Sequence, residues 1–271
     1  MRPRRPSRAC ILLALLFLAG LLRHEARAQE VTAPAIEVRA PVRDVLPSPP
    51  EYFLALSKDL KPRWRTLYQP TPTLSRPDRP LLAMLMGTLL ADSYAAVEAR
   101  DGQRVRNICQ DLRSTFLSLG LAEDAEENLQ LLVGLAEREE WNAIRYELER
   151  GHYRLAEKLL SMHDHDLAVL VELGLWLRTL EMGSRLVQEV GEPARDGVHS
   201  IGSIALMETL QQRAASLQTS TRELDYVQDL EEELERLARR WKEADGEGTL
   251  EDVEATTTKL HNYLKRSFEK S

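Results

Sequence analysis

Beyond Glu51, the apolar residues of the 271-residue chain recur every three or four positions, which is the spacing of amphipathic α-helices. Prolines and glycines divide this pattern into segments of helix length. One short alternating run lies near Ile36, but a single strand without a partner does not make a sheet. The pattern therefore predicts an all-α fold: a multi-helix bundle of about nine helices with no sheet.

Two of the predicted helices, residues 78–100 and 167–190, are apolar on nearly every side. A helix of this kind either spans a membrane or lies at the centre of a packed core. Thr88, Asp92 and Ser93 interrupt the first segment, which leaves it short of the ~18 uncharged residues of a membrane span. We therefore expect two long apolar central helices.

The first of these helices carries a small residue at every fourth position, which places the small residues on one face. They are Ala83, Gly87, Ala91, Ala95 and Ala99. Small side chains allow the backbone of a second helix to approach closely. The stripe predicts that another helix packs against this face.

Residues 224–241 carry apolar residues at alternating intervals of three and four, as in a coiled coil. They are Val227, Leu230, Leu234, Leu237 and Trp241. Two heptads are short for an independent coiled coil. The seam therefore favours burial within the same bundle, and a homo-oligomer formed through residues 224–241 is the alternative.

The N-terminus has the three-part pattern of a secretory signal peptide. Residues 1–8 are basic, residues 9–22 are apolar, and the sequence Ala26-Arg27-Ala28 matches the A-x-A cleavage pattern. The apolar run is shorter than the ~20 residues that span a bilayer. We predict that residues 1–28 are removed as a signal peptide and that the mature protein is periplasmic or secreted, with no transmembrane segment.

The rest of the chain divides by composition into three parts. Residues 29–50 contain five prolines and little helical periodicity, which is typical of a disordered, proline-rich tether. Residues 51–195 form the predicted helical core. Residues 196–271 are predicted to form further helices that pack on this core, and a separate C-terminal lobe is the alternative.

Charge excludes one class of function and disfavours another. The chain has a formal net charge of −7, and removal of the basic signal peptide leaves 30 basic and 42 acidic residues, a net charge of −12. A nucleic-acid-binding protein needs a basic face, so we expect no nucleic-acid partner. The acidic balance also disfavours docking on an anionic membrane surface.

The cysteines predict a fold without disulfides. Cys10 lies in the signal peptide, so the mature chain keeps Cys109 alone. Cys109 lies beside Ile108 on the apolar face of a predicted helix, where a cysteine is usually a small core residue. A nucleophilic or intermolecular role is the alternative.

Asp92 and Arg178 are charged exceptions in the two most apolar helices. Arg178, Glu181 and Arg185 share a helix face at intervals of three and four. If the two helices pack together, Asp92 and Arg178 meet in a buried polar pair that fixes the helix register. A pocket for acid–base chemistry or a small ligand between these helices is the alternative, and carboxylates facing an open cavity would favour it.

His163 and His165 are candidates for a metal site, because each alternates with an aspartate. Histidines two residues apart diverge on a helix, so metal binding would require an extended backbone. An inter-helix turn in which Asp164 or Asp166 caps the next helix is the simpler interpretation. We therefore assign no metal ligand, with His163 and His165 as weak candidates.

Other catalytic and cofactor patterns are missing from the sequence. Glu149 and His152 form a single Glu-x-x-His match, and a di-iron bundle needs two such motifs. Gly151 is also expected to end the helix that would carry them. Nucleophile, zinc-protease and phosphate-loop motifs are absent, so we expect no catalytic residue and no cofactor.

Two stretches carry a resemblance to other proteins. The first runs from Gly87 to Asp92 and continues to Asp101, and the second runs from Leu173 to Glu181. These segments resemble parts of uncharacterised secreted all-helical bacterial proteins of unknown function. The resemblance covers residues 78–190 and implies a helical fold, with no activity attached.

Taken together, these features favour an exported helical protein that acts as a binding or structural module in the cell envelope, with an unidentified protein partner. An enzyme or small-ligand carrier with an inter-helix pocket near Asp92 and Arg178 is the first alternative. A metal-binding protein is the second.

Overall fold

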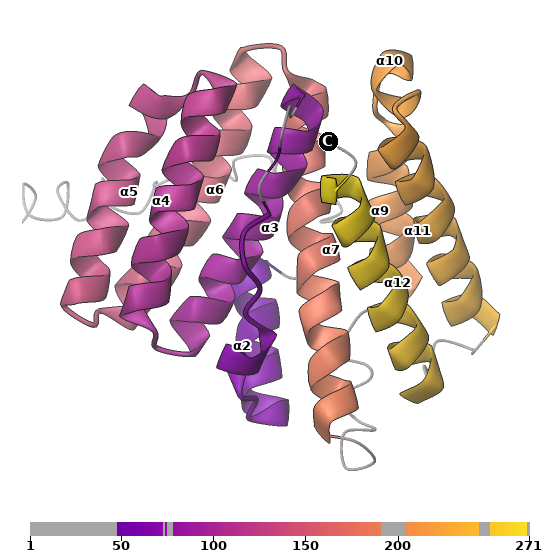
Figure 1. The fold of residues 1–271 in the computed structure, drawn as a ribbon, viewed down its shortest axis with the longest axis horizontal. Coiled ribbons are helices and arrows are strands. Elements are labelled where there is room, and N and C mark those ends of the chain that lie inside the picture. The colour runs from indigo at the N-terminus through magenta and orange to yellow at the C-terminus, as the bar shows by residue number, and fades with distance from the viewer. Residues whose placement is uncertain (1–47, 73, 75–77, 191–203, 244–249, 270–271) are drawn as a thin grey trace, which may run out of the picture. The chain divides into compact units, whose positions relative to one another are not determined.

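The computed structural model describes residues 48–72, 74, 78–190, 204–243 and 250–269, and all regular structure within these residues is helical (Figure 1). The helices are α2 (Pro49–Leu60), the 3₁₀ helix η1 (Trp64–Leu67), α3 (Arg79–Glu98), α4 (Gly102–Leu119), α5 (Ala122–Glu137), α6 (Trp141–Ser161), α7 (His165–Val190), α9 (Ile204–Ala215), α10 (Thr219–Arg222), α11 (Asp225–Glu243) and α12 (Leu250–Glu269). The predicted all-α fold is therefore confirmed for this part of the chain.

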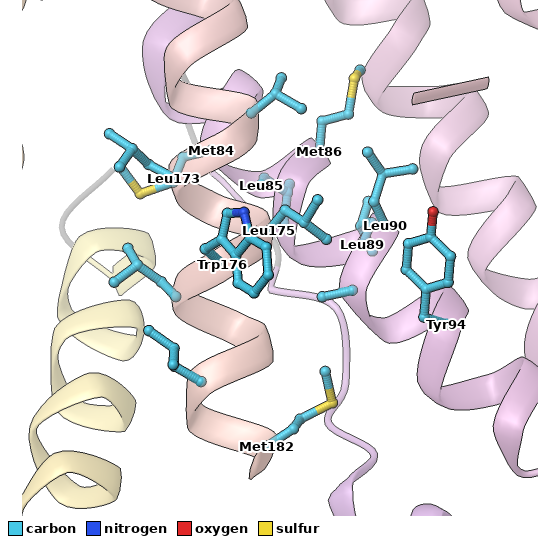
Figure 2. Packing of buried hydrophobic residues seen from close by; sticks show 14 of the residues in the cluster. Met84, Leu85, Met86, Leu89, Leu90, Tyr94, Leu173, Leu175, Trp176 and Met182 are labelled. Atoms are coloured by element: carbon cyan, nitrogen blue, oxygen red, sulfur yellow. The ribbon is translucent and has the colours of Figure 1, made fainter. Parts of the chain in front are cut away.

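The two long apolar helices, α3 and α7, pack against each other more extensively than any other pair of described elements. Nearly every residue of α3 from Leu81 to Val97 is buried. Figure 2 shows side chains of α3, among them Leu89 and Leu90, in the same core as Leu175 and Trp176 of α7. These helices therefore form the centre of the core, as their composition predicts.

Helix α3 is long and apolar enough to cross a membrane by those two criteria alone, with a mean hydropathy of 1.4. Within the fold, however, 89% of this hydrophobic stretch is buried against other helices. The core of a folded domain explains the apolar composition of α3.

Close contact between α3 and α7 depends on a glycine in each helix. A Cβ atom placed on Gly87 would lie 2.1 Å from the carbonyl oxygen of Val171, and one on Gly174 would lie 2.2 Å from the carbonyl oxygen of Met84. Any side chain at either position would therefore collide with the opposing backbone. Gly87 belongs to the predicted small-residue stripe, whereas sequence analysis did not single out Gly174.

Helix α6 corrects one prediction. Gly151 was expected to end a helix, but α6 runs without interruption from Trp141 to Ser161. A Cβ atom on Gly151 would lie 2.7 Å from Oδ1 of Asn128 in α5. Glycine here leaves room for the Asn128 side chain, and the surrounding helix tolerates its low helix propensity.

The C-terminal helices join the core through α7. Both α9 and α12 pack on α7, and α11 packs on α9 and α12. The five apolar residues of the seam in α11 are all buried within the chain. The described residues belong to one compact unit, and packing within the chain occupies the seam.

At its N-terminal end, the described fold begins earlier than the sequence indicates. Helix α2 starts at Pro49 instead of Glu51, because proline is well tolerated in the first turn of a helix. The last two residues of the predicted tether, 29–50, are therefore helical. The predicted signal peptide, most of the tether and the boundary at residue 195 lie outside the described residues.

Candidate functional site

The structure brings Asp92 of α3 and Arg178 of α7 together. Nε of Arg178 donates a hydrogen bond of 2.8 Å to Oδ1 of Asp92, and only 3% of the Arg178 side chain and 13% of the Asp92 side chain are exposed. Nη1 donates to Oε2 of Glu181 at 2.6 Å, and Nη2 donates to the backbone carbonyl of Leu67 at 2.9 Å. All three guanidinium nitrogens are therefore engaged within the protein.

A second arginine reaches the same carboxylate from α4. Nη2 of Arg104 lies 3.6 Å from Oδ2 of Asp92 and donates a hydrogen bond of 2.7 Å to the carbonyl oxygen of Gln69. The guanidinium carbon of Arg104 lies 5.1 Å from the ring centroid of Tyr68, within the range of a cation–π contact. Arg104 thus links α4 to Asp92 of α3 and to the segment around Gln69.

The carboxylate of Glu181 is shared in a similar way. Nε2 of Gln69 donates a hydrogen bond of 2.9 Å to its Oε1 atom, and Nη1 of Arg185 lies 3.8 Å from the same oxygen. Together these contacts define a buried charge cluster, formed by Asp92, Arg104, Arg178, Glu181 and Arg185. The cluster ties α3, α4 and α7 to the non-helical segment after η1.

The charge cluster is built to hold helices in place. Burial alone would lower the pKa of Arg178, but Asp92 and Glu181 outweigh that effect and raise the pKa above its ordinary value. Its guanidinium therefore stays charged and cannot exchange a proton near neutral pH. Because the carboxylates face guanidinium groups instead of an open cavity, this geometry favours the structural interpretation over acid–base chemistry.

Sequence analysis predicted the pair of Asp92 and Arg178 and placed Glu181 and Arg185 on the same helix face as Arg178. It missed the contacts made by Leu67, Gln69 and Arg104. Leu67 is the last residue of η1 and Gln69 lies in the non-helical segment after it, so neither carbonyl accepts a hydrogen bond inside a longer helix. Such a carbonyl needs another donor when it is buried, but the sequence alone does not show which. Nothing in the local pattern marks Arg104 as different from other arginines on α4.

The structure also shows the surroundings of the two candidate metal ligands. His163 lies in the turn before α7 and His165 opens that helix, and both are exposed. Asp164 forms a 2.8 Å ion pair with the arginine at the start of α3, while Asp166 accepts a hydrogen bond from the hydroxyl of Thr221 in α10. Asp166 therefore anchors α10, whereas its predicted role was to cap α7.

No group of three or more histidine, cysteine, aspartate or glutamate side chains in the described part of the chain is placed to hold a metal ion. This observation covers His163 and His165, as well as Glu149 and His152. Because α6 continues through Gly151, the prediction that a helix break at this glycine disrupts the Glu149–His152 motif is wrong.

Cys109 occupies the position that its neighbours predict. Its side chain is buried, and the thiol is free. Burial raises the pKa of Cys109 to about 11, against a smaller lowering by Arg113. The group is therefore a neutral thiol near neutral pH, in keeping with a small core residue.

A groove with a volume of about 400 Å³ lies between α4, α5 and α6. Its lining combines apolar side chains with charged and amide groups at one end of the three helices. The lining residues are Phe116, Leu121, Ala125, Asn128, Gly151, Arg154, Leu155, Glu157, Lys158 and Ser161. The volume lies at the lower end of the ~300–1,000 Å³ typical of small-molecule sites.

The same three helices carry most of the exposed large apolar side chains. Within the described residues, one such side chain, Leu54, lies on α2, and all others lie on α4, on α5, or on α6 and the residue after it. They are Leu117, Leu131, Tyr146, Tyr153, Leu160 and Met162. Exposed apolar side chains that form a continuous patch are typical of a binding surface, which makes α4, α5 and α6 the candidate for one.

His152 in α6 gives this region a predicted pH dependence. Burial lowers the pKa of His152 to about 4, so the folded protein keeps the ring neutral while the unfolded chain takes up a proton below its ordinary pKa of 6.5. Stability is therefore fully present above pH 6.5 and is lost as the pH falls towards 4. Between pH 7 and pH 5, we expect this residue to contribute a loss of about 2 kcal/mol.

Urea unfolding of the wild type and of His152→Gln at both pH values tests this prediction. The variant should lose less stability than the wild type by about that amount, because all other titrating groups are common to the two proteins. An equal loss in both proteins would contradict a neutral His152 in the folded protein.

Comparison with known proteins adds no identification: no family model, no curated protein and no solved structure matches this chain. The resemblance of residues 78–190 to secreted helical proteins therefore stays a prediction.

Proposed function

We propose that this protein is an exported, all-helical binding module of the cell envelope and that it holds a protein partner on the surface of α4, α5 and α6. The observation that carries the proposal is that α4, α5 and α6 hold a groove and also carry most of the exposed leucine and tyrosine side chains of the described residues. Tyrosine is enriched among the residues that supply most of the binding energy at protein interfaces, and apolar side chains form the buried centre of such interfaces.

The charge cluster supports binding over catalysis. Asp92 and Glu181 are each held by arginine side chains, and Arg178 makes three hydrogen bonds inside the protein. Such a cluster makes the core rigid and fixes the register of its helices. A rigid core is a suitable support for a binding surface on neighbouring helices.

Export is the second part of the proposal, and it rests on the sequence pattern of residues 1–28. Cleavage after Ala28 would give a mature chain that begins at Gln29 and is joined to the helical fold by a proline-rich segment. A segment of this composition can act as a spacer between an attachment point and a folded module.

Site-specific photo-crosslinking of the full-length precursor in its own host tests both parts. A crosslinking residue in place of Leu117, which is 68% exposed on α4, should give a discrete adduct with one protein. The matched position is Arg239, an exposed residue of α11, and it should give no such adduct. Peptide mass spectrometry of the exported fraction should find Gln29 as the N-terminal residue.

Two results would overturn this proposal. Adducts of the same pattern from positions 117 and 239 would show that the crosslinks do not report a specific surface. A chain that stays in the cytosol with residues 1–28 attached would contradict export and the proposed location in the cell envelope.

A further inference from the structure

The outward face of α6 carries three large apolar side chains at intervals of seven residues. Tyr146, Tyr153 and Leu160 are 62%, 58% and 46% exposed, so no described element covers them. Residues seven apart on a helix differ in direction by only about 20°, so the three side chains lie along one line on α6. We call this line of Tyr146, Tyr153 and Leu160 the α6 stripe.

The α6 stripe points away from the core of the fold. The buried side chains of α6 lie on the opposite face, and they are Ile144, Leu148, Leu155 and Leu159. Apolar residues with a seven-residue period are typical of a helix that packs along a second helix. The seam of α11 has this period and is buried within the chain, whereas the α6 stripe has no partner among the described residues. The stripe is therefore a helix-packing face without its second helix.

Two opposite charges lie beside the stripe. Arg150 and Glu157 each follow a tyrosine of the stripe by four residues, so both are turned by about 40° to the same side of it. Both residues are exposed, and Glu157 takes part in no ion pair with another described residue.

Arg150 keeps positive charge for a further partner. Its Nη1 atom lies 3.4 Å from Oε1 of Glu147, and Arg154 approaches the other oxygen of the same carboxylate at 3.7 Å. Two arginines thus share one carboxylate, and 53% of the Arg150 side chain is exposed. Glu157 is the residue of opposite charge one stripe interval further along this edge.

We infer that the α6 stripe packs against the same stripe of a second copy of this chain, with the two α6 helices antiparallel about a two-fold axis beside Tyr153. A two-fold dimer joins the same patch of both subunits, so the patch must be complementary to itself. Tyr153 then meets Tyr153 of the second copy, and Tyr146 of each copy meets Leu160 of the other. Tyrosine is enriched among the residues that contribute most to binding at protein interfaces.

Charge complementarity selects the antiparallel arrangement. Arg150 lies three residues before Tyr153, and Glu157 lies four residues after it. At a rise of ~1.5 Å per residue, antiparallel pairing places Arg150 of one copy within about 1.5 Å of the level of Glu157 of the other copy. The two-fold axis repeats this ion pair. In a parallel pair, the axis would place these two residues on opposite sides of the seam.

The dimer goes beyond the proposed function, because it requires no other protein. One pair of helices is a small contact for a specific interface. We therefore expect a reversible dimer with a Kd on the order of 10 μM.

Sedimentation analysis of the purified chain from Gln29 to Ser271, which contains every described residue, tests the inference. Over a concentration range of about 1–100 μM, the wild type should pass from monomer to dimer. Arg150→Glu and Glu157→Arg each turn both ion pairs into repulsive pairs, so each should raise the Kd at least tenfold.

The two charge changes also test the register. The double variant Arg150→Glu/Glu157→Arg should restore the Kd to within about threefold of the wild type, because opposite charges face each other again. An equimolar mixture of the two single variants should form a heterodimer for the same reason. Arg239→Glu is the matched control, since it makes the same charge change on the exposed face of α11, and it should leave the Kd unchanged.

Tyr153→Arg tests the centre of the contact. It places two positive charges beside the two-fold axis and should prevent dimer formation. An unchanged circular dichroism spectrum would show that the fold is intact, as expected for a side chain that is 58% exposed.

Three outcomes would overturn the inference. A wild-type chain that stays monomeric throughout the concentration range would leave the α6 stripe to a different protein. A dimer that Arg150→Glu or Tyr153→Arg does not weaken would have its interface elsewhere. Failure of both the double variant and the mixture to restore dimers would exclude the antiparallel register. The crosslinking experiment at position 117 reports a residue of α4 and a different protein, so its failure and the failure of this inference are distinguishable.

Discussion

Replacement of Gly174 by alanine is expected to lower the free energy of unfolding by roughly 3 kcal/mol or more. The new Cβ atom would lie 2.2 Å from the carbonyl oxygen of Met84 and 3.0 Å from its carbonyl carbon. Since these are backbone atoms, no rotamer change can relieve the collision, and α3 and α7 must move apart. Because these two helices form the most extensive contact of the fold, the separation disturbs the centre of the core.

The same substitution at Gly134 is the control for this experiment. Gly134 lies inside α5, and a Cβ atom there would meet only Nη1 of Arg138, at 3.3 Å, which is the mobile end of a side chain. Gly134→Ala should therefore stabilise the protein by about 0.5–1 kcal/mol through helix propensity. Thermal and urea unfolding of both variants would show opposite signs, and a neutral Gly174→Ala would contradict the close approach of the two helices.

The contrast between the two central helices shows how far sequence alone predicts this packing. In α3, small residues repeat at every fourth position, and this regularity predicts a face for close approach. In α7, Gly174 stands alone between Leu173 and Leu175, so no repeat marks it. The close approach of the two helices was therefore predictable from α3 but not from α7. The spacing of residues along a helix indicates a face, but it does not indicate which element packs against that face.

Gly151 shows the opposite error. A glycine near the end of an amphipathic segment predicts a helix end, because glycine costs about 1 kcal/mol inside a helix. In the structure, α6 continues through Gly151, and the glycine leaves room for the side chain of Asn128 in α5. Local propensity is a weak effect that tertiary packing overrides, and no local pattern reports such packing.

The groove could not be predicted for a related reason. Residues such as Phe116, Ala125 and Leu155 each belong to an ordinary amphipathic pattern in their own helix. Whether these side chains leave a groove between them depends on the distances between α4, α5 and α6. Those distances are set by contacts between residues that lie far apart in the chain. The polar pair, in contrast, was predictable because Asp92 and Arg178 are charged exceptions in apolar helices, and buried charges require partners.

The second large effect is expected for Asp92→Ala, which should lower the free energy of unfolding by roughly 3–5 kcal/mol. The substitution leaves Nε of Arg178 without its acceptor at 2.8 Å and removes the carboxylate that faces Arg104. Arg178 cannot lose its proton to escape this cost, and its side chain is only 3% exposed, so water cannot replace the lost partner. Urea unfolding at neutral pH measures the loss.

Glu235→Ala is the matched control, since it also removes one carboxylate from an arginine pair. Glu235 and Arg239 lie 2.7 Å apart on α11, and both side chains are 65% exposed, so the loss should stay within about 0.5 kcal/mol. Asp92→Asn separates charge from shape, because the amide keeps an acceptor for Nε of Arg178 but brings no negative charge; its effect should fall between those of Asp92→Ala and the control. An unchanged melting temperature in Asp92→Ala would show that the charge cluster does not hold α3 and α7 in register, and the carboxylate would then need another role.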